Sequence, residues 1–353
     1  MNSAYDQILS ADDDTRSGLF ATTAQRLGTT PQNVEKDFWV CWALDALFNG
    51  LTGAQPRLLF KGGTSLSKGF GLINRFSEDI DVTVFRDDLG EAASIKELQA
   101  MSGKKRRASL DAIKAACETY INGPMIKGLN AVIDATAQRT GLSRTRFLVR
   151  PDPDDRQALL LQYPTATAIP DDGYIAKAVK IELGAKSALD PHSVRALRPY
   201  LETDMPGIDL GVGNVTIVDA ERTFWDKVVI LHGLRRWFGL RGELRGGGQR
   251  ISRHYYDIHM LMASESGQRA MANRVLGQDC VAHARLFFDR PAYDLASAKP
   301  PTFSICPEGA MFDELSRDYV AMTTMIFGKA PAFDLVIESV AALEAKLNAL
   351  LPT

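Results

Sequence analysis

The stretch 58–84 constrains the fold of this chain more than any other, because it joins a glycine turn to a pair of carboxylates. Three apolar residues precede Lys61, Gly62 and Gly63, and residues compatible with a helix follow. This order predicts a strand, a tight turn and the start of a helix. Two adjacent glycines permit a positive φ and a close approach of the backbone to a ligand.

The residues after the glycines suit phosphate binding. Thr64 and Ser65 bring hydroxyl and backbone N–H groups to the predicted helix N-terminus, where phosphate oxygens bind well. Lys68 follows one turn after Thr64, so its ammonium can reach a triphosphate on the turn; the alternative is a solvated helix lysine. The residues expected to bind the phosphates of a nucleotide are Gly62, Gly63, Thr64, Ser65 and Lys68.

The carboxylates are Asp79 and Asp81, which alternate with Ile80, Val82 and other apolar residues. A period of two places both carboxylates on one face of a strand. Such a pair favours a cation between its members, and Mg²⁺ with oxygen ligands is the natural choice, with Mn²⁺ as the alternative. Each motif alone is more often a loop or a solvated strand edge. Together and in this order they indicate a nucleotidyl-transfer site.

A third carboxylate, Glu182, lies in the predicted strand 177–183. Its apolar residues share one face, so Lys180 and Glu182 share the other. If that polar face adjoins Asp79 and Asp81, Glu182 completes a metal site of three carboxylates. The alternative is an ordinary exposed face carrying a lysine and a glutamate.

Four segments resemble a known family. Residues 61–68 (KGGTSLSK) and 75–81 (RFSEDID) are similar to the paired signature of the AbiEii-type nucleotidyltransferase toxins, which include the mycobacterial MenT toxins and belong to the DNA polymerase β-like superfamily. Residues 219–227 (DAERTFWDK) resemble the family's helix with a lysine, and residues 253–257 (RHYYD) its closing aspartate motif. The resemblance spans roughly residues 55–265.

The resemblance implies roles for two further residues. Lys227 would contact the NTP or take part in catalysis, and Asp257 would belong to the active site and hold that lysine. From the residues alone, Lys227 lies in an apolar helix and needs an anionic partner if buried, unless its ammonium reaches solvent. Asp257 could also be a helix cap. The fifteen residues between Gly63 and Asp79 exceed the superfamily's general pattern but match this family's spacing.

The resemblance also implies an activity. It implies Mg²⁺-dependent transfer of nucleotides from an NTP to RNA, with release of pyrophosphate. The leading acceptor is the 3′ end of tRNA. The protein would be a toxin of a toxin–antitoxin or phage-defence system that blocks translation, with a cognate antitoxin as partner. Two alternatives stay open: nucleotidylation of a protein or small molecule, and a non-catalytic NTP-binding interaction protein.

An arginine-rich segment supports an RNA acceptor. Six arginines lie within residues 235–253, which we call the arginine loop, with Glu243 as the only acid. Trp237, Phe238 and the glycine run 246–248 are interspersed among them. Such a loop can follow a phosphate backbone and stack on bases; the alternative is a surface loop without a ligand. A second basic cluster occupies residues 104–107.

The length and patterns predict an α/β fold. At 353 residues and 45% hydrophobic composition, the chain can form two domains. We expect a nucleotidyltransferase domain at 1–217, with a mixed β-sheet flanked by helices and a helical insertion at about 91–140, then a C-terminal helical domain at 218–353, in two lobes. Beyond the stretch 58–84, the expected elements are a helical region at 21–48, with a cap at Thr30-Pro31, and strands at 145–150, 158–163, 176–183 and 215–218.

Composition excludes several other classes. The net charge of −2 argues against steering of nucleic acid by the whole chain, so RNA contacts must be local. The four cysteines lack CxxC spacing and the five histidines lack zinc-ligand spacing, which is typical of reduced thiols and structural histidines. The N-terminus does not resemble a signal peptide, and no apolar run reaches eighteen residues. We therefore expect a cytoplasmic protein that does not span a membrane.

Overall fold

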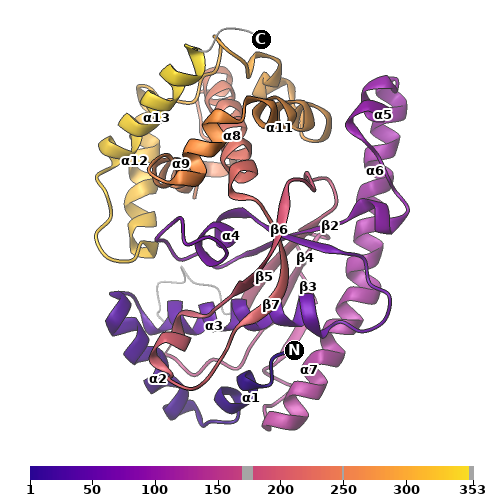
Figure 1. The fold of residues 1–353 in the computed structure, drawn as a ribbon, viewed down its shortest axis with the longest axis vertical. Coiled ribbons are helices and arrows are strands. Elements are labelled where there is room, and N and C mark those ends of the chain that lie inside the picture. The colour runs from indigo at the N-terminus through magenta and orange to yellow at the C-terminus, as the bar shows by residue number, and fades with distance from the viewer. Residues whose placement is uncertain (169–177, 249, 350–353) are drawn as a thin grey trace. The chain divides into compact units, whose positions relative to one another are not determined.

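The structure is a computed structural model that describes residues 1–168, 178–248 and 250–349 (Figure 1). The contacts divide the chain into two compact units. The first comprises residues 1–71, 76–93 and 103–218, and the second comprises residues 72–75, 94–102 and 219–353. Each unit is described by itself below.

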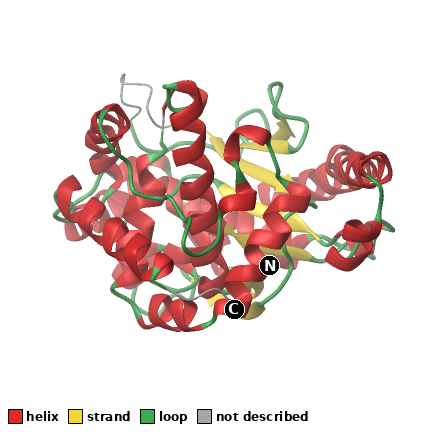
Figure 2. Cartoon of the chain, turned by 90° about the horizontal axis from the view of Figure 1, so that it is seen from above, coloured by secondary structure: helices red, strands yellow, loops and turns green. Residues whose placement is uncertain are grey.

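The first unit is built on a seven-stranded mixed sheet, drawn in yellow in Figure 2, with the strand order β3-β4-β5-β2-β1-β7-β6. The strands are β1 Leu58–Lys61, β2 Ile80–Val84, β3 Leu148–Pro151, β4 Ala158–Gln162, β5 Ala178–Gly184, β6 His192–Leu197 and β7 Val212–Val218. β2 pairs antiparallel with β1 and parallel with β5, and β1 pairs parallel with β7. The predicted mixed sheet is confirmed, and β1 and β2 lie inside it, away from both edges.

The described part of the first unit holds six α-helices. They are α1 Ala4–Leu9, α2 Asp13–Leu27, α3 Pro31–Asp45, α4 Gly62–Lys68, α6 Gly103–Tyr120 and α7 Ile126–Thr140. α3 contacts β5 and β7, and its Trp39 and Trp42 lie 5.2 and 5.0 Å, centre to centre, from the ring of Phe147. The predicted cap is confirmed: the Thr30 hydroxyl accepts a hydrogen bond from the Asn33 N–H, and Pro31 begins the helix.

The sequence patterns located most of these strands but missed one. The predicted strands near 145–150 and 158–163 correspond to β3 and β4; Ala176 and Lys177, at the start of the third, lie outside the described residues. β6 was not predicted. It is an edge strand with mostly exposed side chains, so it lacks the alternation of apolar and polar residues on which such predictions depend.

The second unit is helical. Its helices are α5 Ile95–Ala100, α8 Ala220–Arg241, α9 Ser252–Met262, α10 Glu265–Ala272, α11 Arg274–Phe287, α12 Ala310–Met322 and α13 Phe333–Asn348. α8 contacts α9, α10 and α11. After β7 the described residues form no further strand, as predicted. α5 packs on α11, and the Phe327 N–H donates to the Asn74 carbonyl at 2.9 Å, which ties residues 72–75 to this unit.

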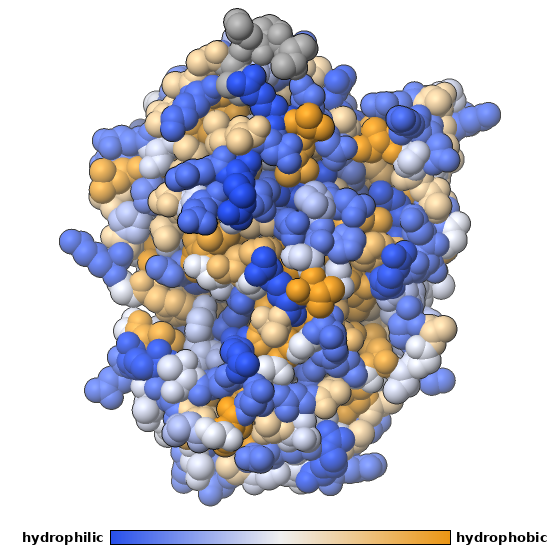
Figure 3. Space-filling view, viewed as in Figure 1, coloured by the Kyte–Doolittle hydropathy of each residue, from blue (hydrophilic) through white to orange (hydrophobic). Residues whose placement is uncertain are grey.

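Hydrophilic residues are spread widely over the face shown in Figure 3, with single apolar residues among them. None of the described helices is both long enough and apolar enough to cross a membrane.

Candidate active site

The glycine turn joins β1 to α4. Lys61 ends the strand, and Gly62 begins the helix with a φ of +82°. A Cβ atom on Gly62 would lie 2.1 Å from Oδ2 of Asp81. Because both the positive φ and this close approach exclude a side chain, the turn requires glycine here and lies directly against the Asp81 carboxylate.

The hydroxyls of Thr64 and Ser65 are buried inside the turn. Thr64 Oγ1 donates to the Asp79 carbonyl oxygen at 2.6 Å and lies 2.7 Å from Ser77 Oγ. Ser65 Oγ donates to the Gly62 carbonyl oxygen at 2.8 Å. These bonds attach the turn to the segment that bears Asp79. Binding of phosphate by the turn stays a prediction, and its free donors would be backbone N–H groups.

The third predicted carboxylate lies beside the first two. Asp79 directly precedes β2, and Asp81 is paired in register with Glu182 of the parallel neighbour β5. The side chains of Asp81 and Glu182 are 28% and 44% exposed, whereas Ile80 and Val82 are buried. The polar face of β5 therefore adjoins the carboxylate face of β2, which is the condition under which the sequence assigned Glu182 to the site.

The carboxylates repel one another. Burial, and then the charges of Asp81 and Asp79, raise the pKa of Glu182 above its ordinary value. Lys180 opposes this rise, with its Nζ 3.3 Å from Glu182 Oε1, and Lys61 Nζ lies 3.9 Å from Asp81 Oδ1. Because burial is the largest cause and the two aspartates add to it, the charge of Lys180 does not restore the ordinary pKa of Glu182.

The donor atoms of this group suit a hard cation. Asp79, Asp81 and Glu182 offer carboxylate oxygens from two adjacent strands, and a divalent ion would relieve their repulsion. Among the described residues, no three His, Cys, Asp or Glu side chains are already gathered closely enough to hold a metal ion. Metal binding by these three residues thus stays a prediction that requires their side chains to converge.

Lys68 is in an unexpected place. Its side chain is only 4% exposed, so the alternative of a solvated lysine is wrong. Its ammonium forms an ion pair with Asp37 of α3 and lies 3.2 Å from the centre of the Tyr200 ring. It also donates to the Arg198 carbonyl oxygen at 3.3 Å. These contacts favour a structural role for Lys68, and contact with a triphosphate stays a prediction.

Three consecutive charged residues of α3 are buried, and two of them form ion pairs with residues next to the site. Glu35, Lys36 and Asp37 are each at most 2% exposed. Lys36 Nζ lies 2.6 Å from Oε2 of Glu78, the residue before Asp79. Asp37 binds Lys68, the last residue of α4. α3 is thus connected to both the carboxylate segment and the turn. The sequence held a signal for this, since three charges interrupt an otherwise apolar helix.

The second unit holds a separate buried cluster around Asp257 of α9. Lys227 Nζ lies 2.8 Å from Asp257 Oδ2, and Arg75 binds the same carboxylate through Nε at 2.7 Å and Nη2 at 2.9 Å. The Lys227 ammonium also donates to His254 Nδ1 at 3.4 Å. The predicted contact between Lys227 and Asp257 is confirmed, whereas Arg75 received no role from the sequence. We call Arg75, Lys227, His254 and Asp257 the Asp257 cluster.

Two cations in this cluster share one carboxylate. Burial acts to raise the pKa of Asp257, but the charges of Arg75 and Lys227 outweigh it and hold that pKa well below its ordinary range. For Lys227, burial and the Arg75 charge outweigh the shared carboxylate, so its pKa is lowered. Burial, Lys227 and Arg253 also lower the pKa of His254, which keeps that ring neutral. An anion close to Lys227 would therefore favour the charged form of this buried lysine.

The prediction of a loop over 235–253 is wrong at both ends, because α8 continues to Arg241 and α9 begins at Ser252. The arginine loop is also less free than its sequence indicated. Arg235 pairs with Glu308 at 2.7 Å and Arg236 with Asp294 at 3.6 Å, and both acids are distant in the sequence. Arg241 is exposed, with its guanidinium 5.5 Å from the centre of the Trp237 ring. Arg245 is exposed as well, 5.5 Å from the centre of the Tyr293 ring. The exposed arginines beside aromatic rings are the part of the loop suited to nucleic acid.

A family model described as "Nucleotidyl transferase AbiEii toxin, Type IV TA system" matches residues 45–348. The chain belongs to the AbiEii family. This AbiEii protein is therefore a nucleotidyltransferase toxin of a type IV toxin–antitoxin system, with an NTP as substrate and an antitoxin as partner.

The chain also matches solved structures. Among six matching chains is MenT4, a nucleotidyltransferase toxin from Mycobacterium tuberculosis H37Rv, with 16% sequence identity and a TM-score of 0.40. The match covers 94% of this chain and 99% of that one. No curated protein matches.

Every predicted site residue of the AbiEii protein lies within the matched segment. The buried charges Glu35, Lys36 and Asp37 lie before it, in the N-terminal part of the chain.

Proposed function

We propose that this AbiEii toxin transfers nucleotides from an NTP to the 3′ end of tRNA in the cytoplasm, releases pyrophosphate and thereby blocks translation. The observation that supports the chemistry best is the pairing of Asp81 with Glu182 directly against the turn at Gly62. A nucleotide held on that turn has its phosphates beside carboxylates that can hold a metal ion.

Asp79, Asp81 and Glu182 are the residues that would hold Mg²⁺, or Mn²⁺ in its place. When bound, the ion supplies neutralisation of phosphate charge and activation of the acceptor hydroxyl. The turn orients the triphosphate through backbone N–H groups of residues 62–65, and the absent side chain at Gly62 lets a ligand approach the Asp81 carboxylate. We assign Lys68 to holding α4 against α3 through Asp37 rather than to the phosphates.

Lys227 and Asp257 complete the proposed catalytic set. Asp257 fixes the direction of the Lys227 ammonium through a 2.8 Å ion pair, and Arg75 holds the far side of the carboxylate. A phosphate group beside Lys227 would favour the charged form of this buried lysine, whose pKa is lowered. In the sequence, Arg75 precedes Asp79 by only four positions. We propose that the lysine stabilises negative charge on the phosphates during transfer.

The RNA acceptor is supported by the exposed part of the arginine loop. Arg241 and Arg245 present guanidinium groups next to Trp237 and Tyr293, an arrangement suited to phosphates and unstacked bases. A tRNA 3′ end is single-stranded, so its bases are accessible to such a surface.

Incubation with labelled NTPs, Mg²⁺ and total RNA tests the proposal. We expect label on RNA of tRNA size, sensitivity to EDTA, and no transfer by Asp81→Asn, whose fold is checked by circular dichroism. Label on protein or on a small molecule would assign a different acceptor. NTP binding without any transfer would leave a non-catalytic interaction protein and contradict the proposed reaction.

A further inference from the structure

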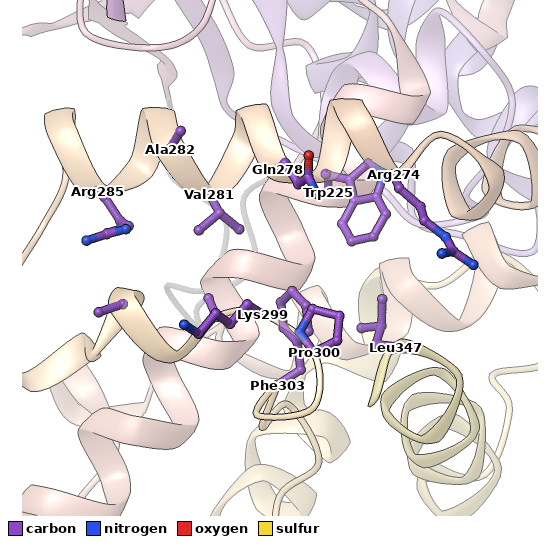
Figure 4. Close-up of a pocket in the computed structure, with 13 residues that line it drawn as sticks. Trp225, Arg274, Gln278, Val281, Ala282, Arg285, Lys299, Pro300, Phe303 and Leu347 are labelled. Carbon is purple, nitrogen blue, oxygen red and sulfur yellow. The ribbon is translucent and has the colours of Figure 1, made fainter. Parts of the chain in front are cut away.

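The strongest unassigned feature of the second unit is a groove of about 320 Å³ between α11 and the loop at 296–303, which we call the α11 groove. Figure 4 shows Arg274, Gln278, Val281 and Arg285 following one another along α11, opposite Lys299 and Pro300. These helix positions are spaced by four, three and four residues, so they form one side of the helix. Arg274, Gln278 and Arg285 are exposed along this side.

The floor of the α11 groove is apolar and tightly packed. Gly277 lies so close to Trp225 that a Cβ atom there would approach the ring to 2.8 Å, so α11 packs directly on α8 at this point. Trp225 is 3% exposed, and its indole N–H donates to the Ala270 carbonyl oxygen at 2.9 Å. Phe303 is 7% exposed. Apolar side chains can pack on this floor, but the ring faces are not free for bases to stack on them.

The rim of the groove is cationic. Arg274, Arg285 and Lys299 are exposed, and within the described part of the chain none of the three has a carboxylate partner. The groove lining contains no Asp or Glu at all among the described residues. This differs from Arg235 and Arg236 in the same unit, whose charges are met by Glu308 and Asp294. The charge at the groove is therefore available to a ligand.

We infer that the α11 groove binds an acidic amphipathic helix of a partner protein. Aliphatic side chains of that helix would pack between Val281 and Pro300, and its flanking carboxylates would pair with Arg274, Arg285 and Lys299. From Arg274 to Arg285 α11 rises roughly 16 Å, about three turns, so a partner helix of three turns spans the groove.

Nucleic acid fits the groove less well than an acidic helix. A site for single-stranded RNA needs exposed ring faces, and here the rings form a buried floor. Besides Gln278, the lining between the cations is aliphatic at Val281, Ala296 and Pro300. Alternation of aliphatic surface and isolated cations matches a helix with apolar and acidic faces.

The test uses the full-length protein and a fluorescein-labelled 16-residue helical peptide with leucines along one face and glutamates on both flanks. Binding is followed by fluorescence anisotropy, with a peptide in which lysines replace the glutamates as control. We expect binding of the acidic peptide only, and weaker binding as salt rises. Arg285→Glu and Val281→Asp should each weaken binding at least about tenfold.

Matched variants outside the groove serve as controls. Arg317→Glu and Val320→Asp change exposed residues of α12 outside the groove and should leave peptide binding unchanged. Arg285→Glu should keep the melting temperature and nucleotide transfer of the wild type, so its result is independent of the proposed reaction.

Three outcomes would overturn the inference. Equal binding of both peptides would show that the groove does not select carboxylates. Loss of tRNA binding in Arg285→Glu with unchanged peptide binding would make the face an RNA surface. A dimer of the wild type that Arg285→Glu dissociates, measured by light scattering, would show that a second copy of this chain covers the groove.

Discussion

At the scale of single residues, the two charged groups of this toxin have opposite imbalances. In the Asp257 cluster two cations share one carboxylate, and the pKa of Lys227 is lowered. Next to the glycine turn, Asp81 and Glu182 lie opposite each other on β2 and β5, and burial and the charges of Asp81 and Asp79 raise the pKa of Glu182. A folded protein keeps such imbalances at a cost to its stability, and they cluster at functional sites because a bound ligand relieves them. The first imbalance suits a phosphate, and the second suits a metal cation.

Glu182→Gln tests the second imbalance. Because the folded pKa of Glu182 is raised, its ionisation lowers the free energy of unfolding as pH rises from the ordinary glutamate pKa through the raised value. The variant removes this effect. Above that pH window and without metal, we expect its melting temperature to equal or exceed that of the wild type, while Mg²⁺-dependent transfer is lost. A variant that melts earlier and still transfers nucleotides would place Glu182 outside the metal site.

Asp257→Asn tests the first imbalance. It removes the carboxylate that pairs with both Arg75 and the buried Lys227, so we expect a loss of about 3–5 kcal/mol in the free energy of unfolding by urea at pH 7. Because the folded pKa of Asp257 is depressed, its contribution is complete above the ordinary aspartate pKa and disappears as pH falls below it. The stability curves of variant and wild type should therefore converge at acid pH.

Lys227→Met is the matched control for that variant. Arg75 still pairs with Asp257, so the fold should survive far better than in Asp257→Asn. Nucleotide transfer should fall steeply, because the proposed phosphate contact is gone. Near-normal turnover with a lowered melting temperature would make Lys227 a structural residue only.

At the scale of elements, α3 shows what a sequence pattern can and cannot predict. Its capped start and apolar residues were predictable from spacing. The partners of Glu35, Lys36 and Asp37 were not, because the residues they bind lie from 31 to 163 positions away in the sequence. The same reason explains Arg75, whose partner Asp257 is 182 positions away.

The carboxylate site shows the complementary case. The face shared by Asp79 and Asp81 follows from the period of one strand, so local spacing was enough. That Glu182 lies opposite Asp81 depends on which strands pair, and the sequence could state it only as a condition. The edge strand β6 was not predicted. Most of its side chains are exposed, so burial does not impose an alternation of apolar and polar residues on its sequence.

Lys68→Met tests the contact between α4 and α3. If the main role of Lys68 is its ion pair with Asp37, the variant leaves a buried carboxylate without this partner and lowers the melting temperature. The KM for NTP then stays close to that of the wild type. Asp37→Asn should have a similar effect, and the double variant should lose less than the sum of both. A raised KM with unchanged stability would restore the triphosphate role that the sequence predicted for Lys68.

At the scale of the whole molecule, the net charge of −2 gives RNA no general attraction. Binding must therefore come from local groups whose charges are not already neutralised. Arg235 and Arg236 are paired with acids, which leaves Arg241 and Arg245 as exposed candidates in the arginine loop. Lys104 and Arg107 of α6 are exposed too and form the rival surface.

A pair of double variants distinguishes these surfaces. Each arginine or lysine that contacts a phosphate releases counterions, so the logarithm of RNA affinity falls linearly with the logarithm of salt concentration. If the arginine loop binds RNA, replacing Arg241 and Arg245 by alanine should make that slope shallower by about 1.5 and raise the KM for RNA. The KM for NTP should not change, because neither residue belongs to the proposed nucleotide site.

Replacing Lys104 and Arg107 by alanine removes the same number of charges from α6 and is the control. Filter binding of labelled tRNA at several salt concentrations gives the slope for each protein. A shallower slope only in the arginine-loop variant supports that loop as the acceptor surface, whereas a shallower slope only in the α6 variant transfers the role to α6. Equal changes in both would mean that RNA contacts both basic clusters, because the slope counts phosphate contacts wherever they occur.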